Sequence, residues 1–155
     1  ASLKTIHLFS IVVWIGGMAF VHFFLRPAVA QLEAPVRLRL MHDVLGRFFQ
    51  AVLVASLLTL ASGVWMLGRV AKQVVQSGGS FEMPLAWTIM AILGVVMVAI
   101  FVHIRFVLFK RLDQAVAASE WTEGGVAMAQ IRRWVLFNLG TGVLVLLVSL
   151  MRWTN

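Results

Sequence analysis

The stretch from 85 to 109, LAWTIMAILGVVMVAIFVHIRFVLF, has only His103 and Arg105 as ionisable side chains. A helix needs roughly 20 apolar residues to cross the hydrocarbon core of a bilayer, and this stretch is long enough. Residues 3–25, 44–67 and 134–151 meet the same criterion. The sequence therefore predicts an all-α integral membrane protein, in which residues 1–155 form a single transmembrane domain folded as a four-helix up-down bundle.

The composition supports a lipid environment. Hydrophobic residues make up 61% of the chain and charged residues only 12%, whereas apolar content in soluble proteins is near half. The net charge of +7 comes from basic residues at the ends of the apolar runs, where they would meet lipid headgroups rather than nucleic acid. Cysteine is absent, which excludes disulfides, thiolate metal sites and covalently attached haem.

The distribution of Lys and Arg predicts the orientation. Four spans place both termini on one side of the membrane and the loops 26–43 and 110–133 on the other. The loop side carries nine basic residues and the terminal side four: Arg26, Arg37, Arg39, Arg47, Arg105, Lys110, Arg111, Arg132 and Arg133 against Lys4, Arg69, Lys72 and Arg152. The positive-inside rule then predicts a multi-pass protein of the inner (cytoplasmic) membrane with both termini outside, in the periplasm.

The two loops on the basic side differ in pattern. The first mixes apolar and charged residues and contains Pro27 and Pro35, which predicts an interfacial segment broken by the prolines. The second, residues 113–130, is rich in alanine before Gly124 and Gly125. It is expected to be a helical extension followed by a turn.

The candidate site residues are histidines, because no Asp or Glu lies within the four spans. His22 and His103 lie near the loop-side ends of the first and third spans, at similar depth. Ionisable residues at such depth are costly and usually functional, and imidazole is a common haem ligand. In an up-down bundle these two helices run in the same direction on one diagonal. We therefore expect a bis-histidyl haem b, with His22 and His103 as ligands of the haem iron.

Three arginines, Arg26, Arg47 and Arg105, are close enough in sequence to pair with haem propionates. The leading interpretation is a membrane b-type haem-binding protein for electron transfer, a possible membrane haem oxidoreductase that exchanges electrons with a quinone or a porphyrin-like donor. No catalytic residue is assigned. The alternative for each histidine is a hydrogen bond to a neighbouring helix.

Two more histidines remain open. His7 precedes His22 by fifteen residues, so it lies on a similar helical face about 22 Å away along the axis. It could hold a second haem, a quinone headgroup or a metal, or contact another helix. The third span offers only Thr88 and Ile89 at that height and face. His42, at the start of the second span, is expected to be interfacial.

Methionines and small residues complete the set of candidates. Met83, Met90 and Met97 recur every seven residues, and thioethers are soft ligands suited to Cu(I), although such stripes more often serve packing. Asn138 is a buried amide that needs a partner. A stripe of small residues in the second span favours close helix packing: Ala51, Ala55, Thr59, Ser62 and Gly63.

Several short motifs resemble the CopD-like family of small four-helix membrane proteins and, more distantly, the HemJ group. The motifs are His7-Leu8, Trp14-Ile15-Gly16-Gly17, Leu25-Arg26-Pro27, His103-Ile104-Arg105-Phe106 and Asn138-Leu139-Gly140. The CopD resemblance implies copper handling, and the HemJ resemblance implies a b-haem protein linked to protoporphyrinogen oxidation. HemJ-like proteins carry a lysine in the third helix, where this sequence has Trp87 and Thr88.

Two alternatives to electron transfer remain open. One is a copper transport or tolerance protein that uses His7, His22, His103 and Met90 along a path. Another is a cofactor-free accessory subunit of a respiratory complex. The expected partners are the lipid bilayer and, in the redox interpretation, a quinone, a second copy in a homodimer or a larger redox complex.

Overall fold

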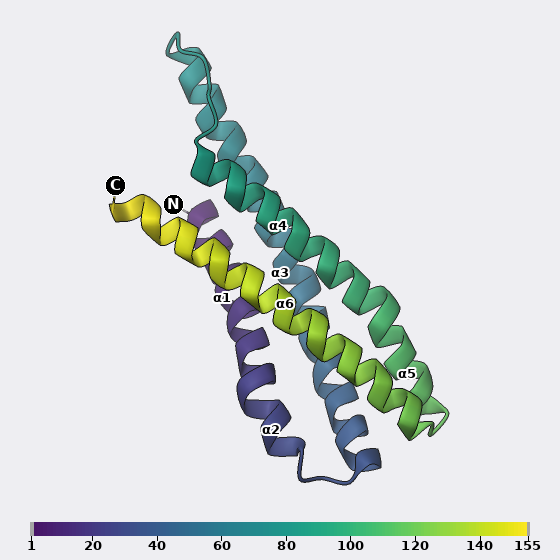
Figure 1. The fold of residues 1–155 in the computed structure, drawn as a ribbon. Coiled ribbons are helices and arrows are strands. Elements are labelled where there is room, and N and C mark those ends of the chain that lie inside the picture. The colour runs from purple at the N-terminus through teal and green to yellow at the C-terminus, as the bar shows by residue number, and fades with distance from the viewer. Residues whose placement is uncertain (1, 155) are drawn as a thin grey trace.

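The structure is a computed structural model that describes the backbone of residues 2–154 and the side chains of residues 2–151. Four long helices form the described chain, and it contains no strand (Figure 1). The first consists of α1 (Ser2–Phe20), the π-helical segment η1 (Val21–Leu25) and α2 (Arg26–Val29), and the second is α3 (Ala34–Gln76). The third consists of α4 (Leu85–His103), the π-helical segment η2 (Ile104–Leu108) and α5 (Phe109–Ala117), and the fourth is α6 (Trp121–Thr154).

The predicted all-α membrane fold is confirmed, because all four helices are long and apolar enough to cross a bilayer. Each expected span lies inside one of them. The N- and C-termini lie at the same end of the molecule (Figure 1). We call this the terminal end, and the opposite end, which carries the turns 30–33 and 118–120, the turn end.

Helix occupies most of the expected loop 26–43, and only residues 30–33 leave the helical conformation. Pro35 lies in the first turn of α3, where the missing N–H of proline would have no helical partner in any case. It therefore starts this helix instead of breaking a segment. The second loop is confirmed as a helical extension, which ends at Ala117 and is followed by a short turn.

Both π-helical segments are at the turn end, and each is close to a histidine. The Arg26 N–H bonds to the Val21 carbonyl, and the Phe109 N–H bonds to the Ile104 carbonyl, so both bonds span five residues. In η1 the wider turn makes room for Pro27, whose ring would clash with a carbonyl four residues earlier in a regular helix. His22 lies within η1, and His103 directly precedes η2.

The helices pack unequally. α1 pairs with α3, and α6 pairs with α4 and α5, while α6 also contacts α1 and α3. Aromatic residues join three of the helices: the ring centroids of Trp14 and Phe101 are 6.2 Å apart, and those of Phe49 and Phe101 are 6.0 Å apart. The fourth helix joins this core through Ile131, which is 1% exposed.

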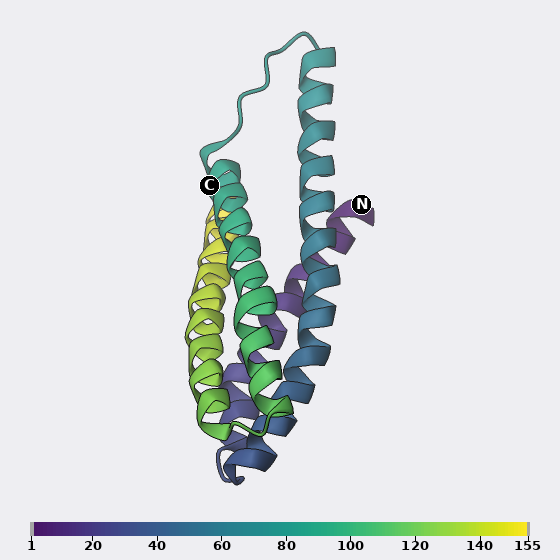
Figure 2. The same ribbon diagram turned by 90° about the vertical axis from the view of Figure 1, so that its right-hand side faces the viewer.

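The buried core stops short of the terminal end. In α3 the last buried residue is Ser62, although the helix continues to Gln76. Figure 2 shows the end of α3 standing beyond the other helices, with the connection to α4 descending from it. The 43 residues of α3 give a length of about 64 Å, roughly twice the thickness of a hydrocarbon core. α3 therefore extends outside the hydrocarbon region.

Candidate functional site

His7 is held by α3 at the terminal end. Its Nδ1 atom lies 3.1 Å from the carbonyl oxygen of Thr59 and 3.0 Å from Oγ of Ser62. A carbonyl oxygen can only accept a hydrogen bond, so Nδ1 carries the proton. The Ser62 hydroxyl donates its own proton to the Leu58 carbonyl at 2.6 Å and is free to accept from Nδ1. The imidazole is therefore held as the tautomer whose Nε2 has an available lone pair.

This arrangement is common among metal-binding histidines, because the hydrogen bond of one ring nitrogen fixes the orientation and basicity of the other. Gly63 makes the close approach of the ring possible. A Cβ atom at position 63 would lie 3.3 Å from Cε1 of His7, tighter than an ordinary contact. The small residues of α3 thus leave room for the imidazole of His7 against the helix. The sequence pattern did not distinguish this role from general helix packing.

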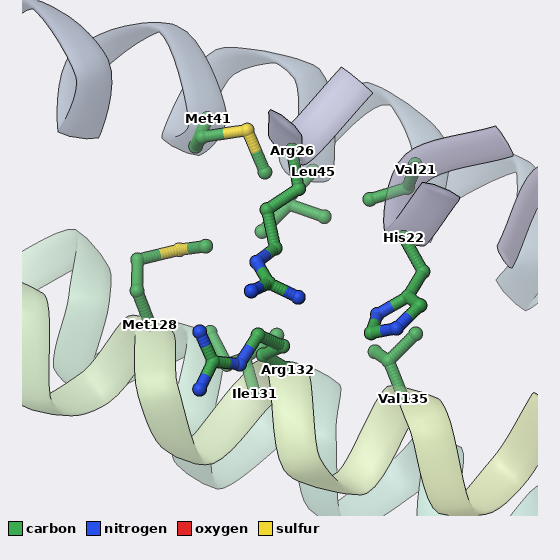
Figure 3. A pocket seen from close by; sticks show the side chains of 9 residues that line it. All are labelled: Val21, His22, Arg26, Met41, Leu45, Met128, Ile131, Arg132 and Val135. Carbon is green, nitrogen blue, oxygen red and sulfur yellow. The ribbon is translucent and has the colours of Figure 1, made fainter. Parts of the chain in front are cut away.

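A second candidate site, the turn-end cavity, lies between the first helix, α3 and α6. It is small, about 20 Å³, which is room for roughly one water. Figure 3 shows the side chains that line it. They are Val21, His22, Arg26, Met41, Leu45, Met128, Ile131, Arg132 and Val135.

Two thioethers face each other in this cavity. The side chains of Met41 and Met128 point toward one another, and the imidazole of His22 lies beyond the guanidinium groups of Arg26 and Arg132 (Figure 3). The sequence did not single out either methionine, because the two are far apart along the chain and belong to no repeat. Only the packing of α3 against α6 brings them together.

A larger groove of about 390 Å³ adjoins the turn-end cavity. It shares Arg26, Met41, Met128 and Arg132 with the cavity and adds Arg37. No carboxylate lines either hollow among the described residues. Two ion pairs among the described residues lie outside both hollows, one between His42 and Asp113 and the other between Arg47 and Asp43. This end of the bundle therefore holds an excess of positive charge.

His22 and His103 are both at the turn end but have different neighbours. His22 lines the cavity, and its ring meets that of Phe23 at a centroid distance of 4.8 Å. His103 packs edge-on against Trp134 of α6, with ring centroids 5.4 Å apart. Ligation of one haem iron by these two imidazoles stays a prediction.

The other arginines expected to pair with a cofactor do not line the cavity. Arg47 is highly exposed and contacts Asp43 at 3.3 Å. The guanidinium carbon of Arg105 lies 5.5 Å from the ring centroid of Phe106 and 5.2 Å from that of Phe109. Of the three expected arginines only Arg26 faces the cavity, and Arg132 joins it from α6.

His42 links α3 to α5. Its Nε2 atom lies 2.7 Å from Oδ1 of Asp113, and its ring stacks on Phe109 at a centroid distance of 5.2 Å. His42 contacts Asp113 through its Nε2 atom and Phe109 through its ring face, and so holds two helices together at the turn end. We assign it no ligand.

Asn138 lies in the middle of the bundle and is 1% exposed. Its Nδ2 donates to the Met97 carbonyl at 3.2 Å, which joins α6 to α4. Its Oδ1 has no hydrogen-bond partner in the described part of the chain. Of the three methionines that recur every seven residues, Met97 of α4 is buried, whereas Met90 of α4 and Met83, which precedes this helix, are partly exposed.

Hard-ligand metal sites are not formed by the described residues, which contain no group of three or more His, Cys, Asp or Glu that could hold a metal ion. Thioether groups are the other ligand type in this chain that suits a soft cation.

The fold and the sites together define a multi-pass helical membrane protein with imidazole and thioether groups inside its bundle. A family model described as Copper resistance protein D matches residues 42–151, and the chain belongs to this family. The CopD-like resemblance is thus confirmed, whereas the HemJ resemblance stays a prediction. The matched range covers most of α3 and the helices that follow it but not His7 or His22. No curated protein and no solved structure matches the chain.

Proposed function

We propose that this protein handles copper in the membrane and binds Cu(I) as its cargo, with His7 as the ligand at the terminal end. The observation that carries the proposal is the contact of His7 Nδ1 with the Thr59 carbonyl oxygen at 3.1 Å. The backbone of Thr59 takes the Nδ1 proton and leaves the Nε2 lone pair for a metal. Membership of the copper resistance protein D family supplies the choice of metal.

At the turn end, His22 with Met41 and Met128 provides the second set of ligands in this proposal. Thioether and imidazole groups suit Cu(I), and the cavity offers both. The guanidinium groups of Arg26 and Arg132 disfavour a lone cation there, so His7 is the stronger ligand position in this proposal. His103 and Met90 remain candidates for the path between the two ends.

The first prediction concerns His7→Asn. An asparagine keeps a side-chain N–H that can bond to the Thr59 carbonyl but lacks the Nε2 lone pair. The affinity for Cu(I) should fall at least about tenfold while the thermal unfolding midpoint changes little. Affinity is measured anaerobically on purified protein in competition with a chromophoric Cu(I) chelator.

His42→Asn is the matched control, because the imidazole of His42 is already engaged by Asp113. The copper affinity of this variant should equal that of the unchanged protein. A His7→Asn protein that binds Cu(I) as tightly as the unchanged one would exclude His7 as a ligand. Absence of Cu(I) binding by the unchanged protein would remove the proposal altogether.

Haem ligation by His22 and His103 is the second candidate function. The observation in its favour is that both histidines adjoin π-helical segments at the same end, and such segments are frequent at functional sites. Electron exchange with a quinone, and assembly as a homodimer or within a redox complex, belong to this candidate.

A visible spectrum of the same purified sample separates the candidates. A Soret band that is lost in His22→Ala and in His103→Ala supports haem ligation, and a colourless protein excludes it. Co-purification with a respiratory complex, without bound copper or haem, supports the accessory subunit.

A further inference from the structure

We propose that the groove at the turn end binds the headgroup of an anionic phospholipid through Arg26, Arg37 and Arg132. We call these residues and their surroundings the arginine groove. The proposal rests on the charge and shape of this groove and not on copper or haem binding, although the groove shares Arg26, Met41, Met128 and Arg132 with the turn-end cavity.

The first argument is charge. The three arginines come from three separate elements, α2, α3 and α6, and line one groove of about 390 Å³. The guanidinium group matches the geometry of phosphate oxygens and forms paired hydrogen bonds with them. Arg37 uses one N–H for the Leu32 carbonyl at 3.1 Å and retains its others.

The second argument is the lack of compensating charge. Among the described residues no Asp or Glu lines the groove, and none forms an ion pair with Arg26, Arg37 or Arg132. The acidic residues at this end, Glu33, Asp43, Asp113, Glu120 and Glu123, are all exposed, and the two aspartates pair with Arg47 and His42. Nothing in the described lining therefore neutralises the three guanidinium charges.

The third argument is that folding itself brings like charges together. The guanidinium groups of Arg26 and Arg132 approach each other from opposite walls (Figure 3). The packing of Met41, which is 3% exposed, and Ile131, which is 1% exposed, holds those walls in place. An anion between the two groups would convert repulsion into attraction.

The groove favours a lipid over a free phosphate ion because its floor is apolar. Carbon-rich side chains continue from the arginines along the groove, and a small inorganic anion would leave them uncovered. They are Val29, Leu38, Met41, Met128 and Ala129. The groove also lies at the turn end, where the expected spans end, and basic pockets between membrane helices bind lipid headgroups.

The test compares phosphatidylglycerol, phosphatidylcholine and inorganic phosphate on the full chain in a neutral detergent, with native mass spectrometry as the readout. Phosphatidylglycerol should bind at least about fivefold more tightly than phosphatidylcholine, and inorganic phosphate should not compete at millimolar concentration. Arg132→Gln should weaken phosphatidylglycerol binding about fivefold, because one arginine near a membrane surface contributes roughly that factor.

Arg133→Gln is the matched control, since Arg133 is adjacent and exposed but does not line the groove, and it should leave lipid binding unchanged. In lipid-free detergent Arg132→Gln should not lower the unfolding midpoint, because it removes a repulsion.

Three results would overturn the proposal. They are equal losses in Arg132→Gln and Arg133→Gln, equal binding of both lipids, and effective competition by inorganic phosphate, which would indicate a site for free anions.

Discussion

His7 and Gly63 face each other across the contact between α1 and α3, and the imidazole is seated because position 63 has no side chain. A Cβ there would lie 3.3 Å from Cε1 of His7, so the ring would have to move by a few tenths of an ångström. Its hydrogen bonds to Thr59 and Ser62 constrain that movement. A substitution at position 63 should therefore displace the imidazole ring without destabilising the helix, and the second prediction uses this difference.

Gly63→Ala should lower Cu(I) affinity several-fold in the chelator competition. It should not lower the thermal unfolding midpoint comparably, because alanine in a helix interior is favoured over glycine by about 1 kcal/mol. Gly68→Ala is the control on the same helix, with nothing within 4 Å of its added Cβ. Equal copper affinities in the two variants would show that the seat of His7 has no bearing on copper binding.

At this scale the sequence identifies which residue types carry chemistry but not which atoms meet. His7 and His22 could be singled out because ionisable residues within apolar spans are rare. The partners of His7 on α3, and the pair Met41 and Met128, depend on which helix faces meet. Methionine is also an ordinary packing residue, so its type alone does not distinguish a ligand from core.

The contact between α1 and α3 relies on a second glycine. A Cβ on Gly17 would overlap Cε1 of Phe48, so the phenyl ring occupies the space that a side chain would need. Gly16, the preceding residue, has nothing within 4 Å. The two neighbouring glycines therefore differ in their importance for packing.

Gly17→Ala should destabilise the bundle by about 1–3 kcal/mol, because Phe48 must leave its place. Gly16→Ala should be neutral or slightly stabilising. The measurement is thermal unfolding in a fixed detergent, followed by circular dichroism. If the two variants unfold at the same temperature, Phe48 moves aside without cost and the contact is less tight than the structure indicates.

At the scale of elements, the sequence predicted four long apolar helices but not where those helices end. Apolar residues define where lipid surrounds the chain, and each predicted span lies within a helix. Hydropathy does not limit a helix that continues into water, as α3 does beyond residue 67. Nor does it reveal a π-helical turn such as η1, which changes the hydrogen-bond spacing without changing composition.

The whole molecule allows its orientation to be tested directly because these 155 residues contain no cysteine. The excess of basic residues at the turn end predicts that this end is cytoplasmic. Ser77, after α3, and Ala118, after α5, are exposed at opposite ends of the bundle. Each can therefore report on one side of the membrane.

In single-cysteine variants, Ser77→Cys should react with a membrane-impermeant maleimide added outside the inner membrane, and Ala118→Cys only after the membrane is opened. Labelling is read as a mass shift on a gel. The reverse pattern would contradict the predicted orientation.

The arrangement of the whole bundle was only partly predictable. Hydropathy gave the number of helices, and their alternation placed both termini at one end, as in Figure 1. In an ideal up-down bundle the fourth helix packs mainly against its two neighbours. Here α6 contacts α3, across the diagonal, as well as its neighbours α1 and α4. The depth of His22 and His103 could thus be inferred from the sequence. The cavity that His22 lines and the contact of His103 with Trp134 could not.

The continuity of α3 links the two candidate sites. One uninterrupted helix carries Thr59 and Ser62 beside His7 and also Arg37 and Met41 at the turn end, about 30 Å away. A shift of this helix along its axis would move both sets of residues by the same amount. Cargo that displaces α3 at one end would then change the lipid affinity at the other, and thermodynamic reciprocity requires the lipid to change the affinity for cargo by the same factor.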